Sequence, residues 1–206
     1  MVAVDAAVPR PRVEPVPPPP GWADVAIAIP DAVLDLRYAT TRNVLGRPFA
    51  PARCLLRAHV AARLVRAAAT LRAAGDRLVL WDCYRTPGAQ AALWAHRPDH
   101  RYVAEPHVDA RGVPTSGSRH TRGTAVDVSL ADVPMPTDHD EFSAAAHRSR
   151  ALAGDGDAAR HASALDAAMT AVGFVGVASE WWHYDVPDGA SSPLADLDLV
   201  PKEPAP

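Results

Sequence analysis

The apolar pattern between residues 57 and 81 constrains the fold of this chain more than any other feature. From Arg57 to Ala74, apolar residues recur at helical spacing and arginines occupy the other faces. Gly75 follows at the position where a helix C-cap commonly stands. The continuous apolar run Leu78-Val79-Leu80-Trp81 comes next and is typical of a buried strand. The sequence therefore predicts a long helix followed closely by a strand of the core.

The remaining segments predict helices and strands in irregular order. Pro87 suits the first turn of a helix that runs to about His96, and another helix is predicted over residues 155–172. Residues 97–117 lack periodicity and contain three prolines, which favours a long loop. Three further segments are predicted to be strands, the last two forming a hairpin: 124–130, 174–177 and 182–186. This irregular order indicates an α+β fold rather than a doubly wound sheet.

Proline dominates both ends of the chain. The first twenty residues end in four consecutive prolines, and three of the last six residues are prolines. Such segments favour extended conformations and cannot pack a core. We therefore expect residues 1–20 and 201–206 to be tails, and residues 21–200 to form one domain that buries a full core.

Charge and hydropathy argue against nucleic acid and membranes as partners. The 206 residues carry a net charge of −3 with no long run of one sign. No segment approaches the apolar run that crosses a bilayer, and the N-terminal residues lack the apolar region of a secretion signal. A cytoplasmic location is expected. Cys54 and Cys83 are then expected to be buried thiols, with one disulfide as the less favoured alternative.

Two short stretches hold the residues that could carry chemistry. The first, Ser118-Arg119-His120-Thr121-Arg122-Gly123-Thr124-Ala125-Val126-Asp127, sets His120 and Asp127 seven residues apart. The second, Glu180-Trp181-Trp182-His183, adds another imidazole and another carboxylate. A catalytic zinc site needs three protein ligands of N and O type, an open position for water, and a base nearby. The two stretches together supply this inventory.

Structural explanations compete with the metal site. The pattern Glu-x-x-His occurs by chance in many chains, and paired tryptophans most often belong to a core. The other histidines stand among polar or helical surroundings and are expected to be ordinary surface or core residues: His59, His96, His100, His107, His139, His147 and His161. Spacing alone leaves both explanations open.

A resemblance to a known family favours the metal site. Residues 118–127 match the pattern S-x-H-x-x-G-x-A-x-D of zinc D-Ala-D-Ala peptidases, and residues 180–183 resemble their E-x-W-H pattern. Asp35-Leu36-Arg37-Tyr38-Ala39-Thr40 and Trp81-Asp82-Cys83-Tyr84-Arg85 narrow the resemblance to VanX-type D-alanyl-D-alanine dipeptidases. The four motifs keep the family's order and cover nearly all of residues 24–200. The resemblance implies a Hedgehog/DD-peptidase-type fold, with a mainly antiparallel sheet flanked by helices.

The resemblance also implies the chemical roles. His120, Asp127 and His183 would bind one zinc ion. Glu180 would be the catalytic base that activates a zinc-bound water. Arg85 would stabilise the oxyanion of the transition state with its permanent charge.

Further residues match positions around the dipeptide. Ser118 and Tyr38 would line the pocket, and Asp140 would lie near the substrate ammonium group. Structural roles remain open beside these, because Arg85 could pair with Asp82 and Tyr38 could belong to the core.

Two segments depart from the family pattern. Residues 135–140 occupy the place of a family segment that begins Met-Gly and ends Phe-Asp, but Pro136 replaces the glycine and His139 the phenylalanine. This region is also shorter than in some members between residues 130 and 135, whereas residues 107–117 look longer than usual. Both departures are expected beside the pocket, where they bear on the substrate more than on the zinc.

The expected activity is zinc-dependent hydrolysis of the small dipeptide D-alanyl-D-alanine, with a role in glycopeptide resistance or in turnover of cell-wall peptides. One alternative is a D,D-carboxypeptidase, or a dipeptidase of different specificity, acting on muropeptides. The other is a non-catalytic, zinc-stabilised binding module, against which Glu180 and Arg85 both argue. A pocket closed around the substrate amine would favour dipeptides, and an open groove would favour longer chains.

Overall fold

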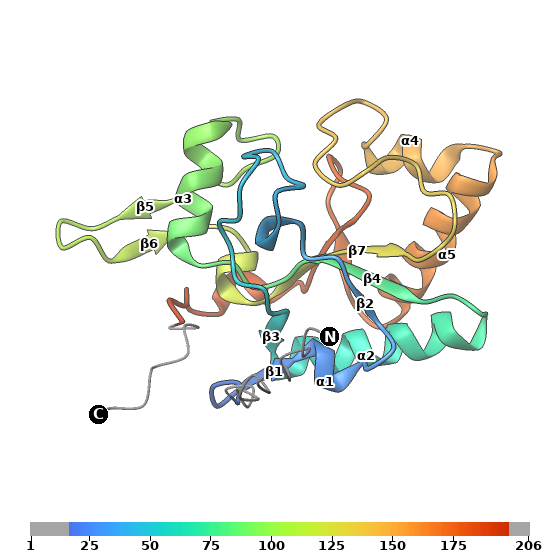
Figure 1. Cartoon of the computed structure of the whole chain (residues 1–206), viewed down its shortest axis with the longest axis horizontal. Coiled ribbons are helices and arrows are strands. Elements are labelled where there is room, and N and C mark those ends of the chain that lie inside the picture. Colours follow the sequence, from blue (N-terminus) through green and yellow to red (C-terminus); the bar gives the residue numbers. More distant parts are fainter. Residues whose placement is uncertain (1–16, 198–206) are drawn as a thin grey trace, which may run out of the picture.

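A five-stranded mixed sheet forms the centre of the protein (Figure 1). The computed structural model describes residues 17–197. Residues 1–16 of the predicted tail 1–20, and the whole predicted tail 201–206, lie outside the described residues. The strand order is β2 (Val33–Leu34), β4 (Leu78–Asp82), β7 (Ala125–Leu130), β9 (His183–Asp185) and β8 (Val175–Gly176). β2 and β4 run parallel, and the other three pairings are antiparallel. The predicted α+β class with a mainly antiparallel sheet is confirmed.

The three longest helices lie where the sequence predicts them: α2 (Ala58–Ala73), α3 (Pro87–His96) and α5 (Asp157–Ala171). α2 runs below the sheet in Figure 1 and contacts α5, and both helices bury apolar side chains in the main core. The Thr86 side chain caps α3 by accepting from the Ala89 amide, with Pro87 at the first helical position. Within residues 17–197, none of the helices combines the length and apolarity that crossing a bilayer requires.

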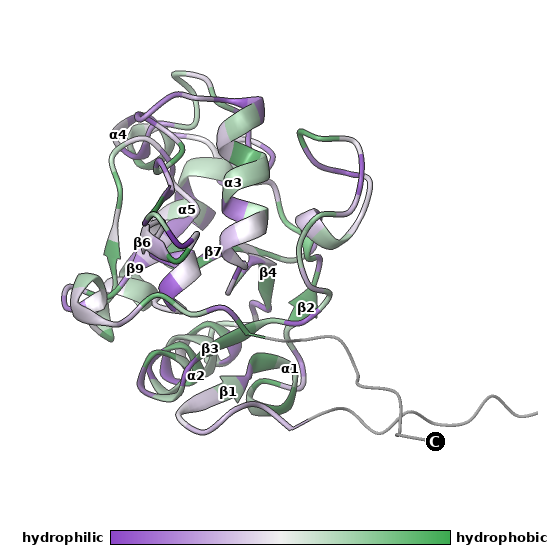
Figure 2. Ribbon diagram, turned by 90° about the vertical axis from the view of Figure 1, so that its left-hand side faces the viewer, coloured by the Kyte–Doolittle hydropathy of each residue, from purple (hydrophilic) through white to green (hydrophobic). Residues whose placement is uncertain are grey.

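The N-terminal part of the fold packs against this core. β1 (Trp22–Asp24) pairs with β3 (Leu55–Arg57) in a separate antiparallel sheet, and the short α1 (Val25–Ala28) follows β1. Figure 2 shows hydrophobic residues gathered on α1, β3 and β4, where these elements face one another. Residues 22–28 and 55–57 are therefore part of the same domain.

A disulfide links Cys54, which precedes β3, to Cys83, which follows β4. The expectation of two free thiols is wrong, although both residues are buried as predicted. The Tyr84 amide donates to the Leu55 carbonyl at 3.0 Å, which brings the two segments side by side. The cysteine Cα atoms are consequently 5.0 Å apart, within the range that a disulfide spans. A separation of 29 residues carries no sign of this proximity.

Some short elements were not predicted. The segment expected to be one long loop contains a hairpin of β5 (His107–Val108) and β6 (Pro114–Ser116), which projects from the body of the protein (Figure 1). α4 (Arg148–Ala153) precedes α5 and contacts it. Elements this short are too brief to display a hydrophobic period, so sequence patterns do not reveal them.

The register of the sheet places polar residues in one row across three strands. Asp127 of β7 pairs with His183 of β9 on one side and with Asp82 of β4 on the other. The register shifts between Leu80 and Asp82, so β4 has one extra residue, Trp81, at this point. Such a bulge changes the direction in which the side chains that follow it point. The bulge therefore brings Asp82 opposite Asp127.

Candidate active site

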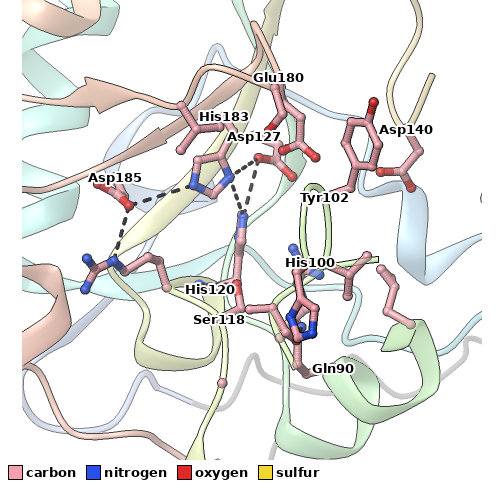
Figure 3. Close-up of a pocket in the computed structure, with 18 of the residues that line it drawn as sticks. Gln90, His100, Tyr102, Ser118, His120, Asp127, Asp140, Glu180, His183 and Asp185 are labelled. Carbon is pink, nitrogen blue, oxygen red and sulfur yellow. Dashed lines mark hydrogen bonds and ion pairs between the residues drawn. The ribbon is translucent and has the colours of Figure 1, made fainter. Parts of the chain in front are cut away.

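The candidate metal ligands meet at the edge of this row. Val126 and Val128 point into the main core, and strand alternation therefore turns Asp127 toward the opposite face. His183 lies directly beside it on β9. His120 comes from η2 (His120–Arg122), the short 3₁₀ turn that leads into β7. Figure 3 shows the three side chains converging.

The three donor atoms have the spacing of a metal site. His120 Nε2 is 3.1 Å from His183 Nδ1, His183 Nδ1 is 3.0 Å from Asp127 Oδ1, and His120 Nε2 is 3.4 Å from Asp127 Oδ1. Ligands about 2.0–2.1 Å from a tetrahedral ion lie about 3.3 Å from one another. Two imidazoles and a carboxylate are also the donor set that zinc accepts. The group therefore fits a divalent metal ion.

Contacts to Nδ1, the ring nitrogen that points away from the other candidate ligands, fix the orientation of His120. Its Nδ1 lies 2.7 Å from the Cys83 carbonyl oxygen and 3.1 Å from Asp82 Oδ2. A proton on Nδ1 would be donated there, which leaves the lone pair of Nε2 for a metal. The His120 amide donates to Ser118 Oγ at 3.1 Å, so Ser118 shapes this turn as well as lining the pocket.

Glu180 projects into the same pocket as the donor atoms (Figure 3). It precedes β9 and is buried. Burial raises the pKa of its carboxyl to about 8, and the nearby carboxylates of Asp127 and Asp140 contribute in the same direction. A carboxyl group with a pKa in this range suits proton transfer near neutral pH.

Arg85 is a buried cation held by Asp82. Its Nε donates to Asp82 Oδ2 at 2.9 Å, so the structural ion pair that the sequence left open as an alternative is present. Burial opposes the charge, but the surrounding carboxylates outweigh it and raise the pKa above its ordinary value. Asp82 is the one hydrogen-bond partner of this side chain within residues 17–197. The terminal guanidinium nitrogens are thus left for a ligand in the pocket.

Tyr38 and Asp140 form a hydrogen-bonded pair in the wall of the same pocket. The Tyr38 hydroxyl donates to Asp140 Oδ1 at 3.0 Å, whereas the buried Oδ2 has no hydrogen-bond partner in the described chain. Burial raises the pKa of Asp140. Tyr38 also packs on Phe49 with ring centroids 4.7 Å apart, so it belongs to both the pocket and a small core cluster.

The residues predicted to bind the metal, to act in catalysis or to bind the substrate line one cavity of about 450 Å³. All eight of them line it: Tyr38, Arg85, Ser118, His120, Asp127, Asp140, Glu180 and His183. The volume is within the range of small-ligand pockets. Other lining residues were not predicted, among them Gln90, His100, Arg101 and Tyr102. Three of these lie in the segment expected to be a loop, where no motif marked them.

His139 lies in the core, one of the two places expected for it, but its contact with a candidate metal ligand was not predicted. Its side chain is buried, and its Nε2 lies 3.2 Å from Asp127 Oδ2. Burial alone would lower the pKa of His139, but Asp140 and Asp127 outweigh it and raise the pKa to about 9. The replacement of the family phenylalanine by His139 was the one sequence signal that pointed here.

The chain is similar to known proteins over most of its length. Residues 20–199 match the peptidase M15 family model described as D-ala-D-ala dipeptidase. The chain is 38% identical over 177 residues to a D-alanyl-D-alanine dipeptidase of Escherichia coli (strain K12), an overlap of 83% of this chain and 87% of the relative. A D-alanyl-D-alanine dipeptidase of Enterococcus faecium is 30% identical over 176 residues, which cover 75% of this chain and 85% of the relative.

Proposed function

Because this chain belongs to the peptidase M15 family of D-Ala-D-Ala dipeptidases, we propose that it is a zinc enzyme that hydrolyses D-alanyl-D-alanine to two D-alanines. The convergence of His120, Asp127 and His183 in one pocket with Glu180 and Arg85 carries the proposal. We also assign the chain to the Hedgehog/DD-peptidase-type fold, which the mainly antiparallel sheet supports.

Two imidazole nitrogens and one carboxylate oxygen would hold the ion. A bound zinc ion supplies Lewis acidity, which polarises a carbonyl group and lowers the pKa of water. Zinc is favoured over magnesium or calcium because those ions prefer sites made of oxygen ligands. His120 and His183 are the residues that impose this preference.

The protein's own groups would move the proton and stabilise charge. Glu180 would accept a proton from the attacking water and pass it to the amine of the leaving D-alanine. Arg85 would donate hydrogen bonds to the scissile carbonyl oxygen as negative charge develops on it. Asp82 keeps the guanidinium in place through Nε, so little reorganisation is needed during the reaction.

The Tyr38–Asp140 pair favours a dipeptide with a free amine. Asp140 Oδ2 is buried without a hydrogen-bond partner in the described chain, and an ammonium group could donate to it. An acylated amine, as in a longer muropeptide, would bring no positive charge to this carboxylate. Tyr38 holds the other oxygen and so fixes the carboxylate. The dipeptidase is therefore favoured over the D,D-carboxypeptidase.

Amine release from D-Ala-D-Ala and from its N-acetyl derivative tests the proposal. We expect zinc-dependent turnover of the free dipeptide, loss of activity with a chelator, and little turnover of the acetylated compound. Glu180→Gln should retain zinc and lose at least about 100-fold in kcat. Glu141→Gln, the same change at an exposed position, should keep full activity. Stoichiometric zinc without turnover would instead support a binding module.

The cellular setting also belongs to the proposal. Removal of D-Ala-D-Ala would serve glycopeptide resistance or cell-wall peptide turnover, and both roles remain predictions. The cytoplasmic location is a prediction as well. The Cys54–Cys83 disulfide weighs against a strongly reducing compartment, because disulfides persist mainly in oxidising ones.

A further inference from the structure

His139 is enclosed by aromatic rings beside the candidate metal centre. Its side chain is 2% exposed. The centroid of its ring lies 5.3 Å from those of Trp81 and Tyr38, and 5.7 Å from that of Trp182. A phenylalanine would fill such an apolar cage equally well. Packing therefore does not explain why this position carries an imidazole.

The ring nitrogens supply the explanation, because they face carboxylates. Nε2 of His139 lies 3.2 Å from Oδ2 of Asp127, within hydrogen-bond distance. Oδ1 of Asp127 is the oxygen that faces His120 and His183, at 3.4 and 3.0 Å. Nδ1 of His139 lies 3.7 Å from Asp140 Oδ2, beyond hydrogen-bond distance. The two oxygens of Asp127 are thus divided between the metal centre and His139.

The backbone around His139 is held on both sides. Arg37 forms a bidentate pair with Asp138, with nitrogen–oxygen distances of 2.8 and 3.1 Å. Asp138 Oδ1 also accepts from the His139 amide at 2.8 Å. On the other side, the Tyr38 hydroxyl holds Asp140. These contacts fix the direction from which the imidazole approaches Asp127.

We infer that His139 is a positioning residue that donates Nε2–H to Asp127 Oδ2 and so presents Oδ1 alone to the metal. The inference rests on the proposed function, since it assumes a metal ion at His120, Asp127 and His183. A carboxylate that is hydrogen-bonded through one oxygen keeps its orientation and does not rotate to bind through both. Loss of such an outer contact commonly weakens metal binding by about 10–100-fold.

Two amide replacements separate this role from mere packing. In His139→Gln, the side-chain NH₂ can occupy the place of imidazole Nε2 and donate to Asp127. In His139→Asn, the shorter side chain can place its NH₂ only near Nδ1, on the side of Asp140. His139→Phe keeps the ring and removes both nitrogens. His59→Phe makes the same change on the exposed face of α2 and serves as the control.

Metal affinity is measured on metal-free protein by competition with a chromophoric chelator for Zn²⁺. We expect the dissociation constant to rise about 10–100-fold in His139→Phe and His139→Asn. His139→Gln should stay close to the wild type, as should His59→Phe. The visible spectrum of the Co²⁺-loaded protein, which reports ligand geometry, should change in the same two variants and in no others. Circular dichroism establishes that each variant is folded.

The results distinguish the possible failures. Wild-type affinity and an unchanged Co²⁺ spectrum in folded His139→Phe would overturn the positioning role while leaving the proposed function intact. If that variant does not fold, unchanged affinity in His139→Asn overturns it equally. A wild-type protein that binds neither Zn²⁺ nor Co²⁺ would refute the proposed metal centre itself.

Discussion

Replacing Asp82 should destabilise the protein more than its single carboxylate would suggest. The side chain accepts from Arg85 Nε at 2.9 Å and lies 3.1 Å from His120 Nδ1. Both members of the Arg85–Asp82 pair are almost fully buried, with side chains 8% and 5% exposed. Asp82→Ala would therefore leave a buried guanidinium without a partner in the described chain.

The magnitude follows from the separation and burial of the charges. Two unit charges with centres about 4 Å apart interact by about 4 kcal/mol at an effective dielectric constant of about 20. Removing one partner of a buried pair typically destabilises a protein by about 3–5 kcal/mol. Asp82→Ala should lower the free energy of unfolding by this amount. In Asp82→Ala/Arg85→Met, the loss should be at least about 2 kcal/mol smaller than the sum of the single losses.

Urea unfolding of the four proteins in the cycle measures these values. Arg77→Met is the matched control, because Arg77 pairs with Asp132 at 2.8 Å but both side chains are exposed. That substitution should change the unfolding free energy by no more than about 1 kcal/mol. In folded Asp82→Ala, kcat should also fall about 10–100-fold because Arg85 loses its anchor. A loss below 1 kcal/mol for Asp82→Ala with no coupling to Arg85 would refute this reasoning.

Three further variants test other parts of the structure. Gly123 has a φ of +69°, and a Cβ there would lie 2.2 Å from Cζ3 of Trp22, so Gly123→Ala should destabilise by about 2–4 kcal/mol in urea unfolding. Removing the disulfide by Cys54→Ala/Cys83→Ala should lower the unfolding free energy by about 3–4 kcal/mol, because it closes a loop of 29 residues in the unfolded chain. In metal-free protein, Glu180 holds its proton up to a pKa of about 8, whereas the unfolded chain releases it near 4.5. The folded state binds more protons in this window, so stability should fall as pH rises from about 4.5 to 8, and Glu180→Gln should remove that part of the slope.

Controls make each of these results interpretable. Gly112 also has a positive φ, +79°, but a Cβ there would meet no atom within 4 Å. Gly112→Ala should therefore be destabilised only by the strained backbone conformation and not by a steric clash. Reduction of the wild type should reproduce the effect of the double cysteine variant. Glu141→Gln should keep the pH dependence of the wild type. A Gly123→Ala protein as stable as Gly112→Ala, an unaltered unfolding midpoint after reduction, or an unchanged slope in Glu180→Gln would each contradict the corresponding prediction.

Local patterns in the sequence were sufficient to predict the long elements of the fold. The helical period and terminal glycine of residues 57–75 correspond to α2, and Pro87 begins α3 as expected. These features depend on residues close in sequence. The hairpin of β5 and β6 escaped prediction because its strands are too short for a period to appear.

The candidate site likewise contains residues that local motifs could predict and contacts that they could not. His120, Asp127 and His183 could be predicted because each stands in a motif that a family resemblance marks. The contact of His139 with Asp127 depends on how two distant segments approach one another, and the Cys54–Cys83 disulfide does so as well. Neither spacing nor composition encodes such an approach. The departure from the family pattern at His139 marked the position without indicating its partner.

The row of polar residues across β4, β7 and β9 limits how this protein can diverge. Since side chains alternate along a strand, a slip of one residue between β7 and β9 would turn His183 away from Asp127 and would expose residues that now fill the core. An insertion or deletion within these strands would therefore remove the metal centre and the fold together. A segment outside these strands, such as 97–117, can change length without disturbing that register. Evolution can accordingly vary the walls of the pocket, and with them the choice of substrate, while the hydrolytic centre stays the same.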